Sequence, residues 1–150
     1  MTFYDERLTR LPDPVDRPDY YRNVPLKRFF AWVIDVTIIG ILAAVITPLT
    51  AFTAVFFFPA FMIVVGFFYR WFTLSGRSAT WGMRMMSIEL RSNLGERFDS
   101  GAAFLHTLGY TLTISTGALQ LVSILLMLIS GRKQGLTDHL MGSAAINRPL

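Results

Sequence analysis

The sequence has no cysteine and few charged residues, and both shortages limit what the protein can be. Without cysteine there is no disulfide and no thiolate metal site. Charged residues make up 16% of the 150 residues, whereas hydrophobic residues make up 53%. A soluble domain of this size needs a more polar surface, so we expect many apolar side chains to face lipid.

Two long stretches, residues 36–69 and 100–131, contain no Asp, Glu, Lys or Arg. Each is longer than the ~20 residues that span the hydrocarbon core of a bilayer. They predict a small polytopic protein of an inner or plasma membrane, with the lipid bilayer as its surroundings. The net charge of +4 comes from basic residues beside these stretches, where such residues set topology, so no nucleic-acid partner is predicted.

Catalytic motifs are also missing from the sequence. It has no Gly-rich phosphate loop, no zinc-ligand spacing and no nucleophile beside a base. Only two histidines are present, which leaves few ligands for a pigment or a metal. We therefore predict that the protein is not an enzyme and that it holds no cofactor and no metal ion.

The apolar pattern predicts an all-α membrane protein built on a transmembrane helical hairpin. Residues 1–27 are polar and rich in proline, which favours an extended arm ahead of a membrane domain over residues 28–147. Within that domain, we place helical spans at about 29–46 and 49–72, joined by a short uncharged link. Pro59 lies inside the second span and predicts a kink there.

The third apolar stretch, residues 102–130, has two possible courses. It is one long tilted span, or it folds back as a re-entrant pair at Ser115 to Gly117. The folded-back course is favoured because each half is only ~20 Å long, which is short for a full crossing. It also leaves all 14 Lys and Arg residues on one side, with the arm and the central loop in the cytoplasm.

The polar central loop, residues 73–101, contains a period-two alternation from Met86 to Leu90 that predicts a short β-element. Residues 143–147 near the C-terminus have the same strand-like character. Because a strand with open edges needs a partner, we expect the two segments to pair in a small cytoplasmic sheet. Such pairing places the loop and the tail on one side of the membrane.

Asp35 lies inside an otherwise apolar helix, roughly 10 Å below its start. An ionised carboxylate there costs several kcal/mol unless it is paired or hydrated. Asp35 is therefore either an intramembrane site for a cation or a proton, or a structural group paired with an arginine of the central loop. Arg28 lies on the same helical face, and Ala31 between them leaves room for another part of the chain.

Three segments resemble the RDD family of membrane proteins, which is named for one arginine and two aspartates. The run from Arg28 to Asp35 is similar to that family's R-x-x-A-x-x-I-D opening. The runs from Thr80 to Ile88 and from Gln134 to Ser143 are similar to its T-P-G-K-R-x-x-x-[ILV] and Q-x-x-H-D-x-x-x-G-T segments. The resemblance implies that Arg28, Asp35 and Asp138 are signature positions. It suggests transport of ions or small solutes and brings no catalytic role.

The sequence departs from the family pattern at three polar positions. Met83 stands where the family usually has lysine, and Thr137 replaces a frequent histidine. His106 lies where members commonly have an arginine, which puts a titratable group in place of a fixed charge. His106 is therefore either a proton relay or a satisfied interface residue.

Asp138 also has two interpretations. It forms a carboxylate pair with Asp35, or it caps a helix or makes a salt bridge to Arg84 or Arg132. The predicted sheet would bring Asp138 toward Arg84 and toward the first helix, where Arg28 begins.

Two functions from different classes fit these features. The first is a transport-related protein with a cation or proton site at Asp35, which would need to form a homo-oligomer because three or four short spans rarely enclose a pathway. The second is a non-catalytic accessory or assembly subunit that docks on a larger membrane complex through aromatic helices and the arm, with Phe3, Tyr4, Tyr20 and Tyr21.

Overall fold

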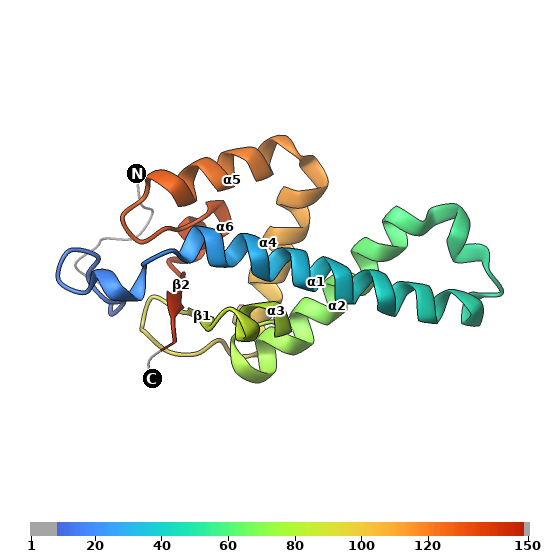
Figure 1. The fold of residues 1–150 in the computed structure, drawn as a ribbon, viewed down its shortest axis with the longest axis horizontal. Helices are drawn as coiled ribbons and strands as arrows, with labels where there is room; N and C mark the ends of the chain where they lie inside the picture. The colour runs from blue at the N-terminus through green and yellow to red at the C-terminus, as the bar shows by residue number, and fades with distance from the viewer. Residues whose placement is uncertain (1–8, 149–150) are drawn as a thin grey trace.

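The computed structural model describes residues 9–148, and its framework is a pair of long helices. Helix α1 covers Val24–Ile46 and helix α2 covers Phe58–Arg77. They lie side by side, and the link between them projects from the body of the molecule (Figure 1). Both helical segments are long and apolar enough to cross a membrane. Residues 1–8, which include Phe3 and Tyr4, lie outside the described part.

The link between the two helices is longer than predicted. It consists of two 3₁₀ helices, η3 over Thr47–Thr50 and η4 over Thr53–Phe57. Helix α2 therefore begins nine residues after the start predicted at residue 49. The predicted kink at Pro59 is wrong, because this proline lies in the first turn of α2, where its missing N–H is not needed.

The third apolar stretch is broken where the sequence predicted a fold-back. Helix α4 covers Ser100–Thr116 and helix α5 covers Ala118–Ile129, with a bend of 116° between their axes. Gly117 forms the break with a φ of +65°, a conformation that glycine adopts without the steric cost of a Cβ atom. The chain thus turns back on itself at Gly117, so this stretch is not one straight helix.

The predicted pairing of the central loop with the tail is present. Strand β1, Ile88–Arg91, pairs antiparallel with strand β2, Ala144–Asn147. Glu89 faces Ile146 in the ladder. Short helices α3, Trp81–Met85, and α6, Leu136–Met141, lie beside this sheet.

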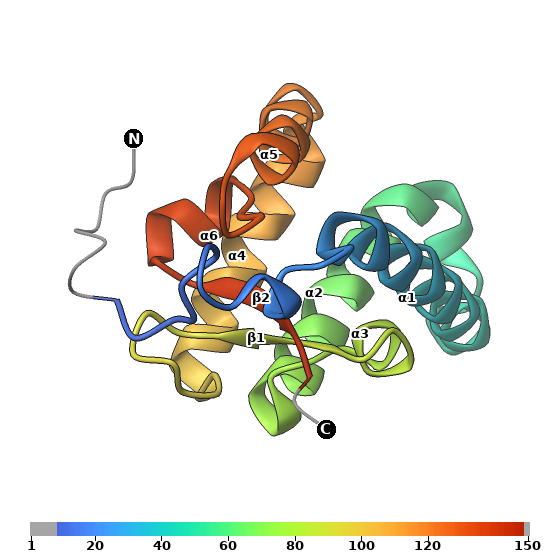
Figure 2. The ribbon, with the colours of Figure 1, turned by 60° about the vertical axis from the view of Figure 1, so that its left-hand side comes forward.

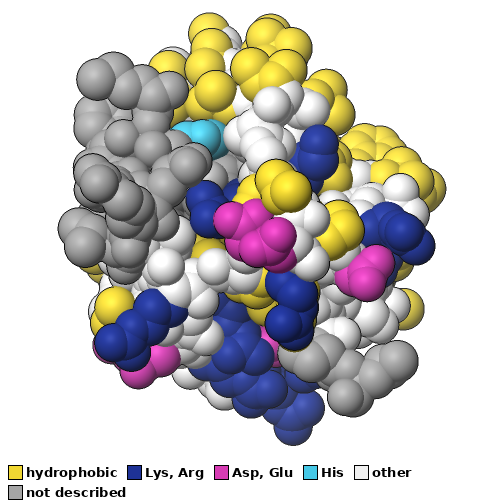
Figure 3. Space-filling view, turned by 90° about the vertical axis from the view of Figure 1, so that its left-hand side faces the viewer, with side chains coloured by type: hydrophobic (Ala, Val, Ile, Leu, Met, Phe, Trp, Pro, Cys, Tyr) yellow, Lys and Arg dark blue, Asp and Glu magenta, His cyan; other side chains and the backbone are white. Residues whose placement is uncertain are grey.

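The well-packed core lies at the sheet end of the molecule. Val24, Leu74, Ile88 and Leu90 are fully buried there, whereas most side chains of the helical hairpin beyond it are exposed. Lys and Arg side chains also gather on this end (Figure 3). The molecule therefore has a compact, charged end and an apolar helical end, as expected for a protein held partly in lipid.

The described part of the N-terminal arm is less extended than predicted. It contains a 3₁₀ helix, Pro18–Tyr20, and lies against strand β2 (Figure 2). Leu11 and Tyr21 are buried against Ala144 and Ile146. The arm thereby covers one face of β2, where these four apolar side chains are removed from water.

Candidate functional site

Asp35 is held by three neutral donors. It lies on the buried stripe of α1 and is 2% exposed. Its carboxylate accepts hydrogen bonds from the Tyr69 hydroxyl at 2.7 Å, the Thr80 hydroxyl at 2.6 Å and the Gly82 backbone N–H at 2.9 Å. The predicted partner, an arginine of the central loop, is wrong, because these three donors occupy the carboxylate. Asp35 instead fastens α2 and α3 onto α1.

The contact between α1 and α3 depends on the absence of a side chain at Gly82. A Cβ atom there would lie 2.2 Å from the carbonyl oxygen of Ala31 and 2.8 Å from Oδ1 of Asp35. The room that Ala31 leaves on α1 is therefore filled by the backbone of α3, as the sequence suggested. Thr80 is the N-cap of α3, because its hydroxyl oxygen accepts from the Met83 N–H at 3.2 Å while it donates to Asp35.

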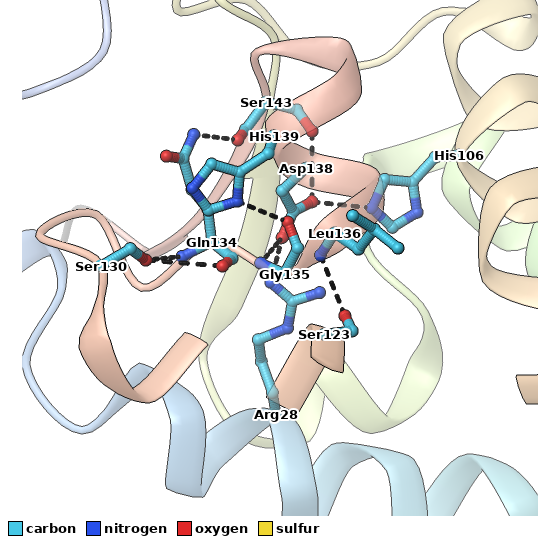
Figure 4. Close-up of polar contacts among 10 residues, drawn as sticks. All are labelled: Arg28, His106, Ser123, Ser130, Gln134, Gly135, Leu136, Asp138, His139 and Ser143. Carbon is cyan, nitrogen blue, oxygen red and sulfur yellow. Dashed lines mark hydrogen bonds and ion pairs between the residues drawn. The ribbon is translucent and has the colours of Figure 1, made fainter. Parts of the chain in front are cut away.

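Asp138 forms the second polar centre, in which four donors surround one buried carboxylate (Figure 4). Arg28 Nη1 approaches Oδ2 at 2.5 Å, and the Gly135 N–H donates to the same oxygen at 3.1 Å. The other oxygen, Oδ1, contacts His106 Nε2 at 2.9 Å and accepts from the Ser143 hydroxyl at 3.2 Å. This centre ties α1, α4, α6 and the start of β2 together.

The Arg28 contact decides the charge state of Asp138. Burial opposes ionisation, but the guanidinium of Arg28 and the ring of His106 hold the pKa of Asp138 well below its ordinary 3.8. The helix-capping interpretation agrees with the Gly135 contact, since Gly135 is the N-cap residue of α6. Asp138 forms its salt bridge with Arg28 and not with Arg84 or Arg132 as predicted. The pair therefore joins two of the signature positions.

The remaining predicted residues have separate places. Asp35 and Asp138 are held by separate sets of donors. Arg84 lies away from Asp138 and donates from Nε to the Ala79 carbonyl at 3.3 Å. Burial and the nearby charges of Arg77 and Arg148 lower its pKa. The sheet therefore brings the tail to the loop without bringing Arg84 to the carboxylate.

A cavity of about 750 Å³ lies between α1, α2, α4, α5 and α6, and both polar centres reach its wall. Its Asp, Lys, Arg and His lining residues are Arg28, Asp35, Arg70, His106, Lys133 and Asp138. Its apolar lining includes Leu26, Phe29, Ile114, Ile124 and Leu128. This volume is in the range of about 300 to 1,000 Å³ that holds small-molecule ligands.

Arg70 is the residue of this wall that sequence reasoning missed. It is 5% exposed, and its guanidinium carbon lies 3.9 Å from the centroid of the Tyr110 ring. Tyr110 in turn accepts a hydrogen bond from Trp32 Nε1 at 2.9 Å. The signal was present in the sequence, because Arg70 is the first charge after a 34-residue gap and lies within an apolar run.

The apolar helices and the charged centre at their packed end fit a small helical membrane protein. The model of the RDD family matches residues 23–142, and the chain belongs to this family. Neither a comparison with curated proteins nor one with solved structures finds a match. The family's three signature residues thus have defined contacts here, Arg28 with Asp138, and Asp35 with α2 and α3.

Proposed function

We propose that this is a transport-related, solute-binding membrane protein in which the cavity, and not a carboxylate cation site, holds the solute. The single observation that carries the proposal is the cavity of about 750 Å³ with a largely apolar wall and charged groups from α1, α2, α6 and the loop before α6. Binding sites in membrane helix bundles are typically lined in this way, because intramembrane charges face a cavity and not lipid.

The cation hypothesis loses support from the contacts of the two aspartates. A cation needs free carboxylate oxygens, yet Asp35 already accepts three hydrogen bonds. Asp138 is paired with Arg28 and accepts further bonds from Gly135 and Ser143. Coordination of a cation would require these donors to withdraw, at a cost of about 1 to 3 kcal/mol for each buried donor left unpaired. A solute in the open cavity needs no such rearrangement.

Trp32 lines the cavity and offers a direct test. With Trp71 and Trp81 changed to Phe, Trp32 becomes the sole tryptophan. We expect terminally brominated C12 chains to quench its fluorescence saturably in neutral-lipid nanodiscs. Thr113→Phe, which adds bulk to the cavity wall, should weaken this binding at least about tenfold, or ~1.4 kcal/mol. Leu112→Phe is the matched control, because Leu112 is 59% exposed and outside the lining.

The proposal fails if quenching rises linearly with probe concentration, as for random lipid contact. It also fails if Thr113→Phe and Leu112→Phe both keep wild-type thermal stability and both bind the brominated probe with the affinity of the parent protein.

The accessory-subunit hypothesis is favoured by one different observation. Phe67, Trp71 and Phe104 form an edge-to-face ring cluster across α2 and α4, with ring centroids 5.2 to 6.3 Å apart. Aromatic surface of this kind suits a protein partner or the headgroup layer. Purification in mild detergent with mass measurement separates the two functions, because a homo-oligomer favours transport and a stoichiometric foreign partner favours docking.

A further inference from the structure

We propose that Arg70 and Tyr110 form a headgroup subsite in the cavity, and that its ligand is an amphiphile with one negative charge and an apolar chain. This inference rests on the proposed function, since it names the class of solute that the cavity takes. It assigns a binding role to an arginine that contributes to neither of the two aspartate centres.

The Arg70 guanidinium contacts an aromatic ring but no hydrogen-bond acceptor within the described residues. Within residues 9–148, the Arg70 guanidinium makes no hydrogen bond and no ion pair, and its buried Nε is unsatisfied. A guanidinium has five N–H donors, and the Tyr110 ring beneath the guanidinium carbon gives them a cation–π contact but no oxygen acceptor. These donors are therefore available to an acceptor.

The position of Arg70 makes this lack of a partner unusual. It lies seven residues before the end of α2, or about 10 Å along the helix axis, and so within the apolar part of the protein. A charged side chain at such a depth is rare and normally pairs with another group. Structural arginines of this chain follow that rule, as Arg28 does with Asp138.

The cavity wall carries one more positive than negative charge, which a single anion would balance. These charges comprise three cations, Arg28, Arg70 and Lys133, and two carboxylates, Asp35 and Asp138. Both carboxylates are occupied by their own donors, so neither neutralises Arg70 by direct contact. One ligand anion would balance the excess positive charge, and a carboxylate or phosphate-like group has the geometry that a guanidinium binds in a bidentate manner.

The rest of the wall favours a ligand with an apolar chain over a small inorganic anion. Phe29, Ile114, Ile124 and Leu128 line the same cavity as Arg70. Burial of a chain on such side chains contributes about 0.8 kcal/mol for each CH₂ group. A free single-chain acid and an anionic bilayer lipid share this chemistry, and the experiment below distinguishes them.

The test compares two probes of equal chain length, brominated dodecanoate and brominated dodecanol, in the Trp32-only protein and neutral-lipid nanodiscs. At about pH 9 the dodecanoate is ionised, well above the ordinary carboxyl pKa. We expect the anion to bind at least about tenfold more tightly than the alcohol. Arg70→Gln should abolish this preference, because affinity falls much more for the anion than for the alcohol. Arg70→Lys should restore part of it, because the charge returns without the planar fork.

Arg77→Gln is the matched control, since Arg77 lies on the same helix but is exposed at its end. The subsite proposal is overturned if the wild-type protein binds both probes saturably with equal affinity, a result that leaves the proposed function standing. It is also overturned if Arg77→Gln removes the preference as fully as Arg70→Gln does. Absence of saturable binding by either probe would instead refute the proposed function itself.

A third arm assigns the source of the ligand. Replacing part of the neutral lipid with phosphatidylglycerol supplies an anionic headgroup from the bilayer. Weaker dodecanoate binding under these conditions, lost in Arg70→Gln, supports the subsite and identifies bilayer lipid as its occupant. Unchanged dodecanoate binding supports the subsite and identifies a free single-chain acid. If Arg70→Gln unfolds, Tyr110→Leu keeps the guanidinium charge, removes the ring and should reduce the preference for the anion.

Discussion

Arg28 and Asp138 form a buried ion pair at 2.5 Å although 110 residues separate them in the sequence. The Arg28 side chain is 13% exposed and the Asp138 side chain is fully buried. The pair joins the start of α1 to α6, and two of the three RDD signature residues thereby act as one structural unit.

Removal of Arg28 should be one of the costliest single changes in this protein. Arg28→Gln leaves the Asp138 carboxylate buried without its cation, which should lower the free energy of unfolding by about 3 kcal/mol. Chemical denaturation in detergent measures this loss. Arg22→Gln is the control, because the Arg22 side chain is 73% exposed, and it should change stability by less than about 0.5 kcal/mol. Equal effects of the two variants would contradict the structural role of the pair.

Asp35 should tolerate asparagine better than alanine. The amide oxygen of Asn can replace Oδ1 as acceptor for Tyr69 and Gly82, and the Thr80 hydroxyl can rotate to accept from the amide. We expect Asp35→Asn to cost about 1 kcal/mol and Asp35→Ala, which leaves three donors unpaired, about 3 kcal/mol or more. If Asp35→Asn keeps stability but abolishes a cation-dependent flux, Asp35 is a cation site after all.

Gly82→Ala should destabilise the contact of α3 with α1. The added Cβ would meet a backbone carbonyl oxygen 2.2 Å away, and neither helix can give way without losing the Asp35 hydrogen bonds. A loss of roughly 1 to 3 kcal/mol is expected from such overpacking. Gly76→Ala, where nothing lies within 4 Å of the new atom, should be neutral or slightly stabilising. Thermal unfolding of the two variants measures the difference, and equal melting temperatures would contradict the close contact of α3 with α1.

Asp138 should make the protein sensitive to acid. Because its pKa is lower in the folded protein than its ordinary 3.8, the unfolded chain takes up the proton first as the pH falls. The stabilisation is therefore fully present above about pH 5 and decreases as the pH falls below that. Asp138→Asn should be less stable at neutral pH and should show a flatter decline in acid. Unfolding curves from pH 3 to 7 check this, and parallel declines would contradict it.

The orientation in the membrane gives a topological prediction. With the loop and the tail joined by β1 and β2, both lie on one side, and the basic residues favour the cytoplasm. Reporter fusions after Pro48 and after Arg148 should therefore report opposite sides. If both report the outside, the stretch from Ser100 to Ile129 crosses the membrane once.

Sequence patterns predicted the features that depend on spacing. The break at Gly117 was predicted from the length of the apolar stretch and the glycine at its centre. The pairing of β1 with β2 was predicted from the strand-like character of the two segments. The start of α2 could not be predicted in this way. The side chains from Leu49 to Phe58 are mostly apolar, and hydropathy does not distinguish 3₁₀ turns from α-helix.

Contacts of the candidate site were harder to predict than its members. Arg28, Asp35 and Asp138 were all identified, but the donors to Asp35 are two hydroxyls and a backbone N–H. Such groups occur throughout any sequence and carry no charge that would single them out. Arg70 was missed for a related reason, since only the packing of α2 against α4 shows that this cation faces a ring and a cavity.

The late position of Asp138 also affects how the protein is made. A ribosome adds about 5 to 20 residues each second, so α1 leaves it many seconds before the carboxylate for Arg28 exists. During that interval the Arg28 guanidinium lacks the carboxylate that it pairs with in the finished protein. Only after Gly135 to Ser143 have been synthesised can the pair form, and α1, α4 and the tail then lock together. A chain that stops before this segment would leave Arg28 and His106 without the carboxylate that joins them.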